Sequence, residues 1–148
     1  MKSSITSLVA SGLVSCALAI GAATPSFAQS GALAKADIPF AFQVGNKILP
    51  AGTYLFSRDG ANIMILRGTE KDTQIASMVL PDTGLNAPKV GRVTFTKYGD
   101  RYFLHKVSTA GSSTSYHWTT GVQEKKLIHE LRNQPPTEVA VNVMPNLH

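Results

Sequence analysis

Cysteine is nearly absent from this chain: Cys16 is the only one among 148 residues. It lies in a segment with the features of a secretory leader, because Lys2 is followed by an apolar run from Leu8 to Ala23 and Ala28 ends a stretch of small residues. We expect a signal peptide over residues 1–28 and export of the protein to the periplasm or out of the cell. The mature chain would keep no cysteine, so no disulfide could stabilise it.

Cys16 also allows a second interpretation. The segment Leu13-Val14-Ser15-Cys16 has the residue types of a bacterial lipobox, in which the cysteine becomes the lipidated first residue of the mature protein. However, the apolar run continues from Ala17 to Ala23, whereas a lipidated cysteine normally ends such a run. Cleavage near Ala28 is the leading expectation, and a lipoprotein anchored at Cys16 is the minor alternative.

Long hydrophobic runs are missing as well. The leader is too short and too weakly flanked for a retained membrane span, which needs about 20 strongly apolar residues. Its removal takes 28 of the 148 residues and leaves 120, enough for one domain with a single core. We expect one β-rich domain over residues 29–148 with no transmembrane span.

Acidic residues are fewer than basic ones. Without Lys2 of the leader, 13 Lys and Arg face 9 Asp and Glu, a net formal charge of +4. Lys125-Lys126 is the only adjacent basic pair, and Glu124 beside it indicates a solvated helix face. Export removes nucleic acid as a partner. The charge favours attraction to an envelope component such as an anionic glycan or a lipid head group.

Motifs that carry catalysis are missing too. No serine lies in a G-x-S-x-G turn, no glycine pattern resembles a phosphate-binding loop, and no cysteine nucleophile remains after processing. Asp59, Asp82 and Asp100 lie in expected loops, where aspartate commonly forms turns. The histidines do not favour a metal site, because they are at least twelve residues apart: His105, His117, His129 and His148. We therefore expect no metal and no cofactor.

Alternating apolar and polar residues dominate from Asp37 onward, which is the pattern of strands with one buried face. Asp59-Gly60 and Tyr98-Gly99-Asp100-Arg101 lie between such runs and predict two hairpins. The segment 47–49 fits either a strand or a loop. The other expected strands cover residues 38–44, 53–58, 63–67, 74–80, 92–97, 102–108, 115–119 and 137–143.

The period of the apolar residues changes between Gly121 and Arg132, which predicts one amphipathic helix. Thr120 and Gln123 have capping-box spacing, and Pro135-Pro136 prevents continuation. Apolar residues on both faces of some strands indicate that this helix covers part of a sheet. The predicted fold is mainly β, a small soluble antiparallel barrel or sandwich of about seven to eight strands with one C-terminal amphipathic helix.

Two regions could bind a ligand. Tyr116, His117 and Trp118 follow a flexible small-residue loop and could form an aromatic platform for a sugar or another flat ligand. The long connection 81–91 contributes Asn86 and Lys89. In an up-and-down meander, the connections 59–62, 81–91 and 109–114 would emerge at one end, and the two longest would frame one mouth.

Two motifs carry a resemblance to a known group. Ile38-Pro39-Phe40-Ala41-Phe42-Gln43-Val44-Gly45, followed by Leu49-Pro50-Ala51-Gly52-Thr53-Tyr54, resembles the opening of small exported β-rich proteins of environmental diderm bacteria. The aromatic hairpin Tyr98 to Leu104 is similar to theirs, while Ser115 to Gly121 departs from their proline-containing approach to the helix. The resemblance implies export and a β-rich fold. It transfers no functional residue, because the group has no established activity.

The leading hypothesis is a non-enzymatic exported module that binds or supports something in the cell envelope. One alternative is a small-ligand carrier with an apolar interior lined by Phe40, Phe42, Phe95 and Phe103. The other is a hydrolase that uses loop carboxylates, which requires two carboxyl groups facing one cleft with no basic partner.

Overall fold

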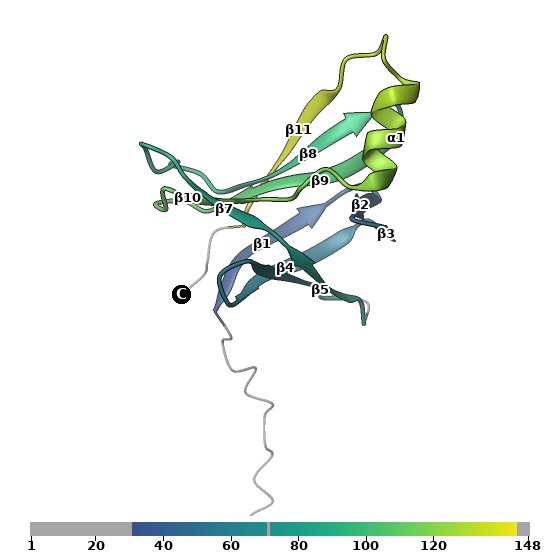
Figure 1. The fold of residues 1–148 in the computed structure, drawn as a ribbon. Coiled ribbons are helices and arrows are strands. Elements are labelled where there is room, and N and C mark those ends of the chain that lie inside the picture. The colour runs from purple at the N-terminus through teal and green to yellow at the C-terminus, as the bar shows by residue number, and fades with distance from the viewer. Residues whose placement is uncertain (1–30, 71, 145–148) are drawn as a thin grey trace, which may run out of the picture.

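The computed structural model describes residues 31–70 and 72–144, which form eleven strands and one helix (Figure 1). The expected leader, with Cys16 and the cleavage position after Ala28, lies outside the described residues, as does His148. Within the described ranges, no helix combines the length and the apolar character that a membrane crossing requires.

The strands form two sheets. The first has the order β1-β4-β5-β6 and consists of β1 (Ala32–Ile38), β4 (Gly52–Asp59), β5 (Ile63–Gly68) and β6 (Gln74–Met78). The second has the order β11-β8-β9-β10-β7, with β2 beside β9 and β3 beside β2. Its strands are β2 (Phe42–Val44), β3 (Lys47–Leu49), β7 (Leu80–Thr83), β8 (Arg92–Tyr98), β9 (Arg101–Ser108), β10 (Thr114–His117) and β11 (Thr137–Asn142).

The mainly β class is confirmed, but the barrel alternative, the wholly antiparallel pairing and the number of strands are wrong. The described strands form two sheets and no closed barrel. The second sheet is mixed rather than antiparallel throughout, because β2 pairs with β9 in parallel at Gln43 and Phe103. The described residues form eleven strands instead of seven or eight, partly because β1 and β2 are separate and residues 74–80 are divided at Val79. After this division the chain passes from one sheet to the other between β6 and β7 (Figure 1).

Both hairpins predicted from turn sequences are confirmed. β4 pairs with β5 up to Asp59 and Ile63, and Gly60 in the turn has φ of 76°. β8 pairs with β9 up to Tyr98 and Arg101, and Gly99 has φ of 57°. Positive φ values are easily adopted by glycine, which explains its position in each turn.

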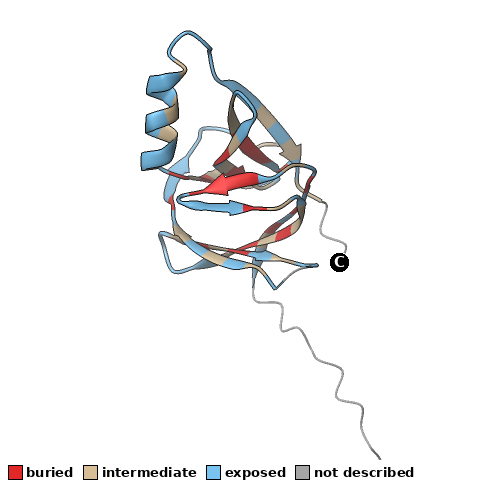
Figure 2. Ribbon diagram, turned by 90° about the vertical axis from the view of Figure 1, so that its right-hand side faces the viewer, coloured by how far each residue is buried: buried red, intermediate tan, exposed pale blue. Residues whose placement is uncertain are grey.

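One hydrophobic core is shared by the two sheets, and the buried residues lie mainly between them (Figure 2). Phe95 of β8 is fully buried in this core, and its ring centroid lies 5.1 Å from that of Phe40 and 5.3 Å from that of Phe42, both edge to face. Such aromatic pairs add about 0.5–1.5 kcal/mol to the stabilisation from buried area. The fully buried residues of the two sheets include Ile38, Phe56, Met64, Leu66, Val93 and Val107.

The single helix near the C-terminus is confirmed, but its packing differs from the prediction. α1 spans Val122–Glu130, with Gly121 as N-cap and no side-chain cap, so the expected capping box at Thr120 is wrong. None of its residues is buried, and Figure 2 shows the helix largely exposed beside the sheets. Val122 is 77% exposed. The amphipathic pattern therefore does not cover a sheet as expected.

Candidate functional site

A groove of about 490 Å³ lies on the outer face of the second sheet. Because side chains alternate along a strand, the burial of Val93 and Phe95 in the core turns Arg92 of β8 to the opposite face, where it is exposed; Thr94 also lines the groove but is only 8% exposed. The same alternation on β11 presents Glu138 and Ala140. The groove is lined by residues of four strands and of the loop before β8: Pro88, Lys89, Val90, Arg92, Thr94, His105, Lys106, Ser108, His117, Glu138 and Ala140.

Strand register places the central wall residues in a row. Thr94 lies opposite Ala140 of β11 on one side and opposite Lys106 of β9 on the other. Lys106 in turn lies opposite His117 of β10. Arg92 lies opposite Ser108 and forms the next row, about 7 Å further along the strands. The groove floor is thus built on paired backbone, which fixes the spacing of its polar groups.

A β-bulge adds one more basic group. The register shifts between Thr94 and Phe95, so that Thr94 faces Lys106 while Phe95 faces Leu104. His105 is the extra residue on β9, and a bulge re-aims side chains next to it. For this reason His105 and Lys106 both line the groove although they are adjacent in sequence.

The walls of the groove carry a clear excess of positive charge. Lys89, Arg92 and Lys106 are basic side chains, and Glu138 is the one acidic residue among those that line the groove. Two imidazoles, His105 and His117, can add charge on protonation, and their ring centroids are 5.8 Å apart. A concave surface lined by one sign of charge raises the local concentration of oppositely charged ligands.

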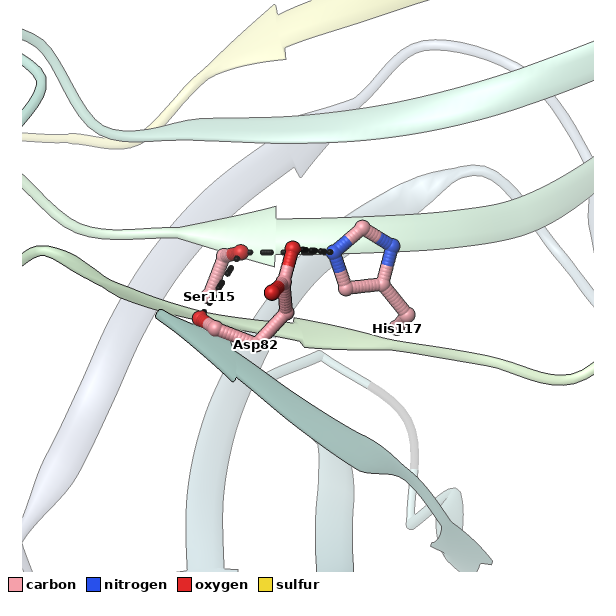
Figure 3. A network of polar contacts seen from close by, with 3 residues as sticks. All are labelled: Asp82, Ser115 and His117. Atoms are coloured by element: carbon pink, nitrogen blue, oxygen red, sulfur yellow. Dashed lines mark hydrogen bonds and ion pairs between the residues drawn. The ribbon is translucent and has the colours of Figure 1, made fainter. Parts of the chain in front are cut away.

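A polar network of three residues lies at the β10 end of the groove (Figure 3). Nε2 of His117 lies 3.3 Å from the Ser115 hydroxyl and 3.4 Å from Oδ2 of Asp82. The Ser115 hydroxyl also lies 3.4 Å from the Asp82 backbone carbonyl, to which it can donate. In a Ser-His-Asp hydrolase, the hydroxyl and the carboxylate contact opposite nitrogens of the imidazole. Here both contact the same nitrogen, so the Asp82 carboxylate does not orient the imidazole to accept a proton from the Ser115 hydroxyl.

The charge of His117 is set by opposing influences. Burial lowers the pKa of its imidazole below the ordinary 6.5, and the nearby Lys106 and His105 lower it further, while Asp82 acts in the opposite direction. His117 is therefore mostly neutral near pH 7. An added anion would favour the protonated form, as Asp82 does.

The predicted trio does not form a common platform. Tyr116 and Trp118 are 4% and 7% exposed and belong to the core, while His117 between them lies on the groove face. The Tyr116 hydroxyl accepts a 2.7 Å hydrogen bond from Arg58, and the Trp118 ring packs edge to face on Phe56. Strand alternation thus leaves His117 as the member of the trio that faces the groove.

The two candidates on the long connection also separate. Lys89 lines the groove, whereas Asn86 is exposed and is not among the lining residues. The expected neighbourhood of the two long loops is confirmed, because Gly84 N donates to Ser113 O at 2.9 Å and Gly111 N to Pro88 O at 3.0 Å. The reason differs from the meander that we expected: β7 joins the edge of the second sheet by pairing with β10.

Sequence reasoning missed most of the groove: Arg92, Thr94, His105, Lys106, Ser108, Glu138 and Ala140. Their signal was the outward half of each alternating strand; the sequence predicted the β8–β9 hairpin, but it did not predict that β11 lies beside β8. No group of three or more His, Cys, Asp and Glu side chains within residues 31–70 and 72–144 is placed to hold a metal ion.

The three carboxylates expected in loops are dispersed, and two of them lie in strands instead: Asp59 ends β4 and Asp82 belongs to β7. Asp82 contacts His117, a basic partner. Asp100 lies in the β8–β9 turn, while Asp82 lies near the Ser108 end of β9, because both Asp82 and Ser108 pair with Ser115. β9 has eight residues, so these two carboxylates are separated by about 25 Å at 3.3 Å per residue. They do not face one cleft.

Comparison with known proteins gives no match: no family model, curated protein or solved structure matches the chain. The function is therefore inferred from the geometry and charge of the groove.

Proposed function

We propose that the protein is an exported, non-enzymatic module of the cell envelope whose basic groove binds an acidic glycan. The observation that carries this proposal is the combination of Lys89, Arg92 and Lys106 in a groove of about 490 Å³ with Glu138 as the one acidic wall residue. That volume lies within the range of small-ligand sites, about 300–1,000 Å³. The leader pattern at residues 1–28 supports export.

The uncharged part of the wall favours a glycan over other anions. Thr94 and Ser108 offer hydroxyl groups, and the Glu138 carboxylate can accept hydrogen bonds from sugar hydroxyls. The cations would bind the carboxylate or sulfate groups of the same ligand. A lipid head group also supplies an anion, but Val90 is the one large aliphatic side chain in the wall, which gives an acyl chain little to contact.

The apolar carrier receives no support from the positions of its proposed lining. The ring centroid of Phe95 lies 5.1 Å from that of Phe40 and 5.3 Å from that of Phe42, both edge to face, and Tyr102 stacks on Phe40 at 3.9 Å. These rings fill the space between them. The separation of Asp82 and Asp100 likewise gives no support to a hydrolase that uses paired loop carboxylates.

Isothermal titration calorimetry of the purified protein with alginate oligosaccharides, and with neutral malto-oligosaccharides of equal length, tests the proposal. We expect binding to alginate alone. Lys106→Gln should weaken it about fivefold, because one partly exposed charge contact contributes on the order of 1 kcal/mol. Lys35→Gln is the matched control, since Lys35 is exposed on β1 of the other sheet and its loss should change affinity less than about twofold.

Two results would overturn the proposal. Equal weakening by Lys106→Gln and Lys35→Gln would mean that alginate responds only to net charge. Stronger binding to phosphatidylglycerol vesicles than to alginate, with no binding to phosphatidylcholine vesicles, would assign the groove to a lipid head group instead.

A further inference from the structure

The β10 end of the groove already holds a carboxylate of the protein itself. Asp82 lies on β7, the edge strand next to β10, and its Oδ2 is 3.4 Å from Nε2 of His117 (Figure 3). His117 is a wall residue of the groove, whereas Asp82 is not among the residues that line it. The side chain of Asp82 thus reaches the groove from its rim and contacts one of its basic groups.

The other charged groups around His117 would attract an anion. Lys106 and His105 of β9 face the same imidazole and lower its pKa, and Asp82 is the acidic group that opposes them. On the far side, Glu124 of α1 interacts with His105 rather than with His117. If the Asp82 carboxylate moved away, His117, His105 and Lys106 would present a site for one anionic group.

The contact between Asp82 and His117 is weak enough to be exchanged. Its 3.4 Å separation exceeds the 2.7–2.9 Å typical of charge-assisted hydrogen bonds. The Asp82 side chain is 65% exposed, so water can solvate its carboxylate in either position. The backbone of Asp82 is paired with Ser115 of β10. A change of side-chain rotamer would therefore free His117 without disturbing the sheet.

We infer that Asp82 is an internal competitor of the ligand: its carboxylate occupies the His117 end of the groove and is displaced by an anionic group of the bound glycan. This inference rests on the proposed function, because it concerns the same groove. It assigns His117, together with Lys106, to one acidic group of the ligand. It also makes Asp82 a residue that limits affinity, so that only ligands with a strong anion at this position bind well.

The test compares Asp82→Asn with Asp100→Asn in titrations with alginate oligosaccharides. Both variants remove one negative charge, but Asp100 lies in the turn at the opposite end of β9. We expect Asp82→Asn to tighten binding about three- to fivefold, because an anionic group of the ligand would no longer compete with the Asp82 carboxylate for the His117 imidazole. Asp100→Asn should change affinity less than twofold, and the gain from Asp82→Asn should shrink as salt increases.

Unchanged or weaker binding by Asp82→Asn would overturn the inference, and weaker binding would mean that Asp82 orients His117 for the ligand. An equal gain from both variants would also overturn it, because net charge would then explain the effect. If the proposed function itself is wrong, the wild-type protein would not bind alginate, or its binding would be insensitive to Lys106→Gln. The inference about Asp82 would then fail as well. Thermal unfolding of both variants should match the wild type.

Discussion

Trp118 provides a test of the core that can be worked out in advance. Its side chain is 7% exposed, and its ring lies 6.5 Å from Phe56, edge to face. The indole N–H is buried and has no hydrogen-bond partner among the described residues. A buried donor without a partner costs about 1–3 kcal/mol of stability. Trp118→Phe removes this donor and keeps an aromatic ring in the same place.

The expected change in stability is small because two effects oppose each other. The smaller ring buries roughly 40 Å² less apolar area, which costs about 1 kcal/mol, and a residual cavity adds to this loss. Removal of the unpaired N–H should raise the free energy of unfolding by about 1–3 kcal/mol. We expect the free energy of unfolding of Trp118→Phe to lie within about 1 kcal/mol of the wild-type value, although large buried aromatic residues usually contribute more.

Urea unfolding followed by circular dichroism measures this change, since Trp118 is the only tryptophan and its fluorescence is lost in the variant. Tyr54→Phe is the matched control. The Tyr54 hydroxyl is satisfied, donating to Pro50 O at 2.7 Å, so its removal should cost about 0.5–1.5 kcal/mol. A loss above about 2 kcal/mol for Trp118→Phe would refute the reasoning, because it would show that the indole N–H is not a net cost.

Three further predictions concern other parts of the molecule. Burial raises the pKa of Glu124 above its ordinary 4.5, so ionisation of this carboxyl group is less favourable in the folded state. Glu124→Gln should therefore be more stable than wild type in thermal unfolding at neutral pH, and this gain should vanish below pH 4.5. A destabilised variant at neutral pH would contradict this prediction. The pKa of His117 is lowered in the folded state, so protonation of the imidazole favours unfolding. The wild type should therefore lose stability as the pH falls through 6.5, while His117→Gln should lose less. Parallel pH profiles of the two proteins in urea titrations would contradict this. A Cβ at Gly91 would meet Ser108 O at 3.0 Å and the Cβ of Val143 at 3.1 Å, so Gly91→Ala should cost about 1–3 kcal/mol in urea unfolding. A neutral result would contradict the close packing of these three residues.

The sequence predicted the elements whose signals are local. The two hairpins followed from Asp59-Gly60 and from the turn at Gly99, where glycine adopts positive φ. The segment 74–80 was misjudged because its extended pattern continues through Val79, while only the tertiary fold determines that β6 and β7 belong to different sheets. The strand β1 was missed at its start because Ala32 to Ala36 has little β-branched or aromatic character.

The candidate site was also predictable only in part, because local signals in the sequence mark some of its residues but not others. Lys89 and His117 were chosen from local features, namely a long connection and an aromatic cluster, and both line the groove. Arg92 and Lys106 stand alone in the sequence, so they formed no basic run that could be noticed. The pairing of β8 with β9 was predicted, but the register shift between Thr94 and Phe95, which places Lys106 opposite Thr94 on the groove face, was not. The prediction that the helix covers part of a sheet was wrong because an amphipathic pattern does not require that its apolar side be buried.

The most direct measurement of the proposed function is the position of the bound glycan. Amide chemical shifts of the isotope-labelled protein, recorded during titration with alginate oligosaccharides, report that position. Binding in the groove predicts the largest shifts on β8, β9 and β10, around Thr94, Lys106 and His117, with little change on β4 and β5 of the other sheet. Shifts concentrated on α1 or on the first sheet, or no shifts at saturating alginate, would contradict the assignment of the groove as the binding site.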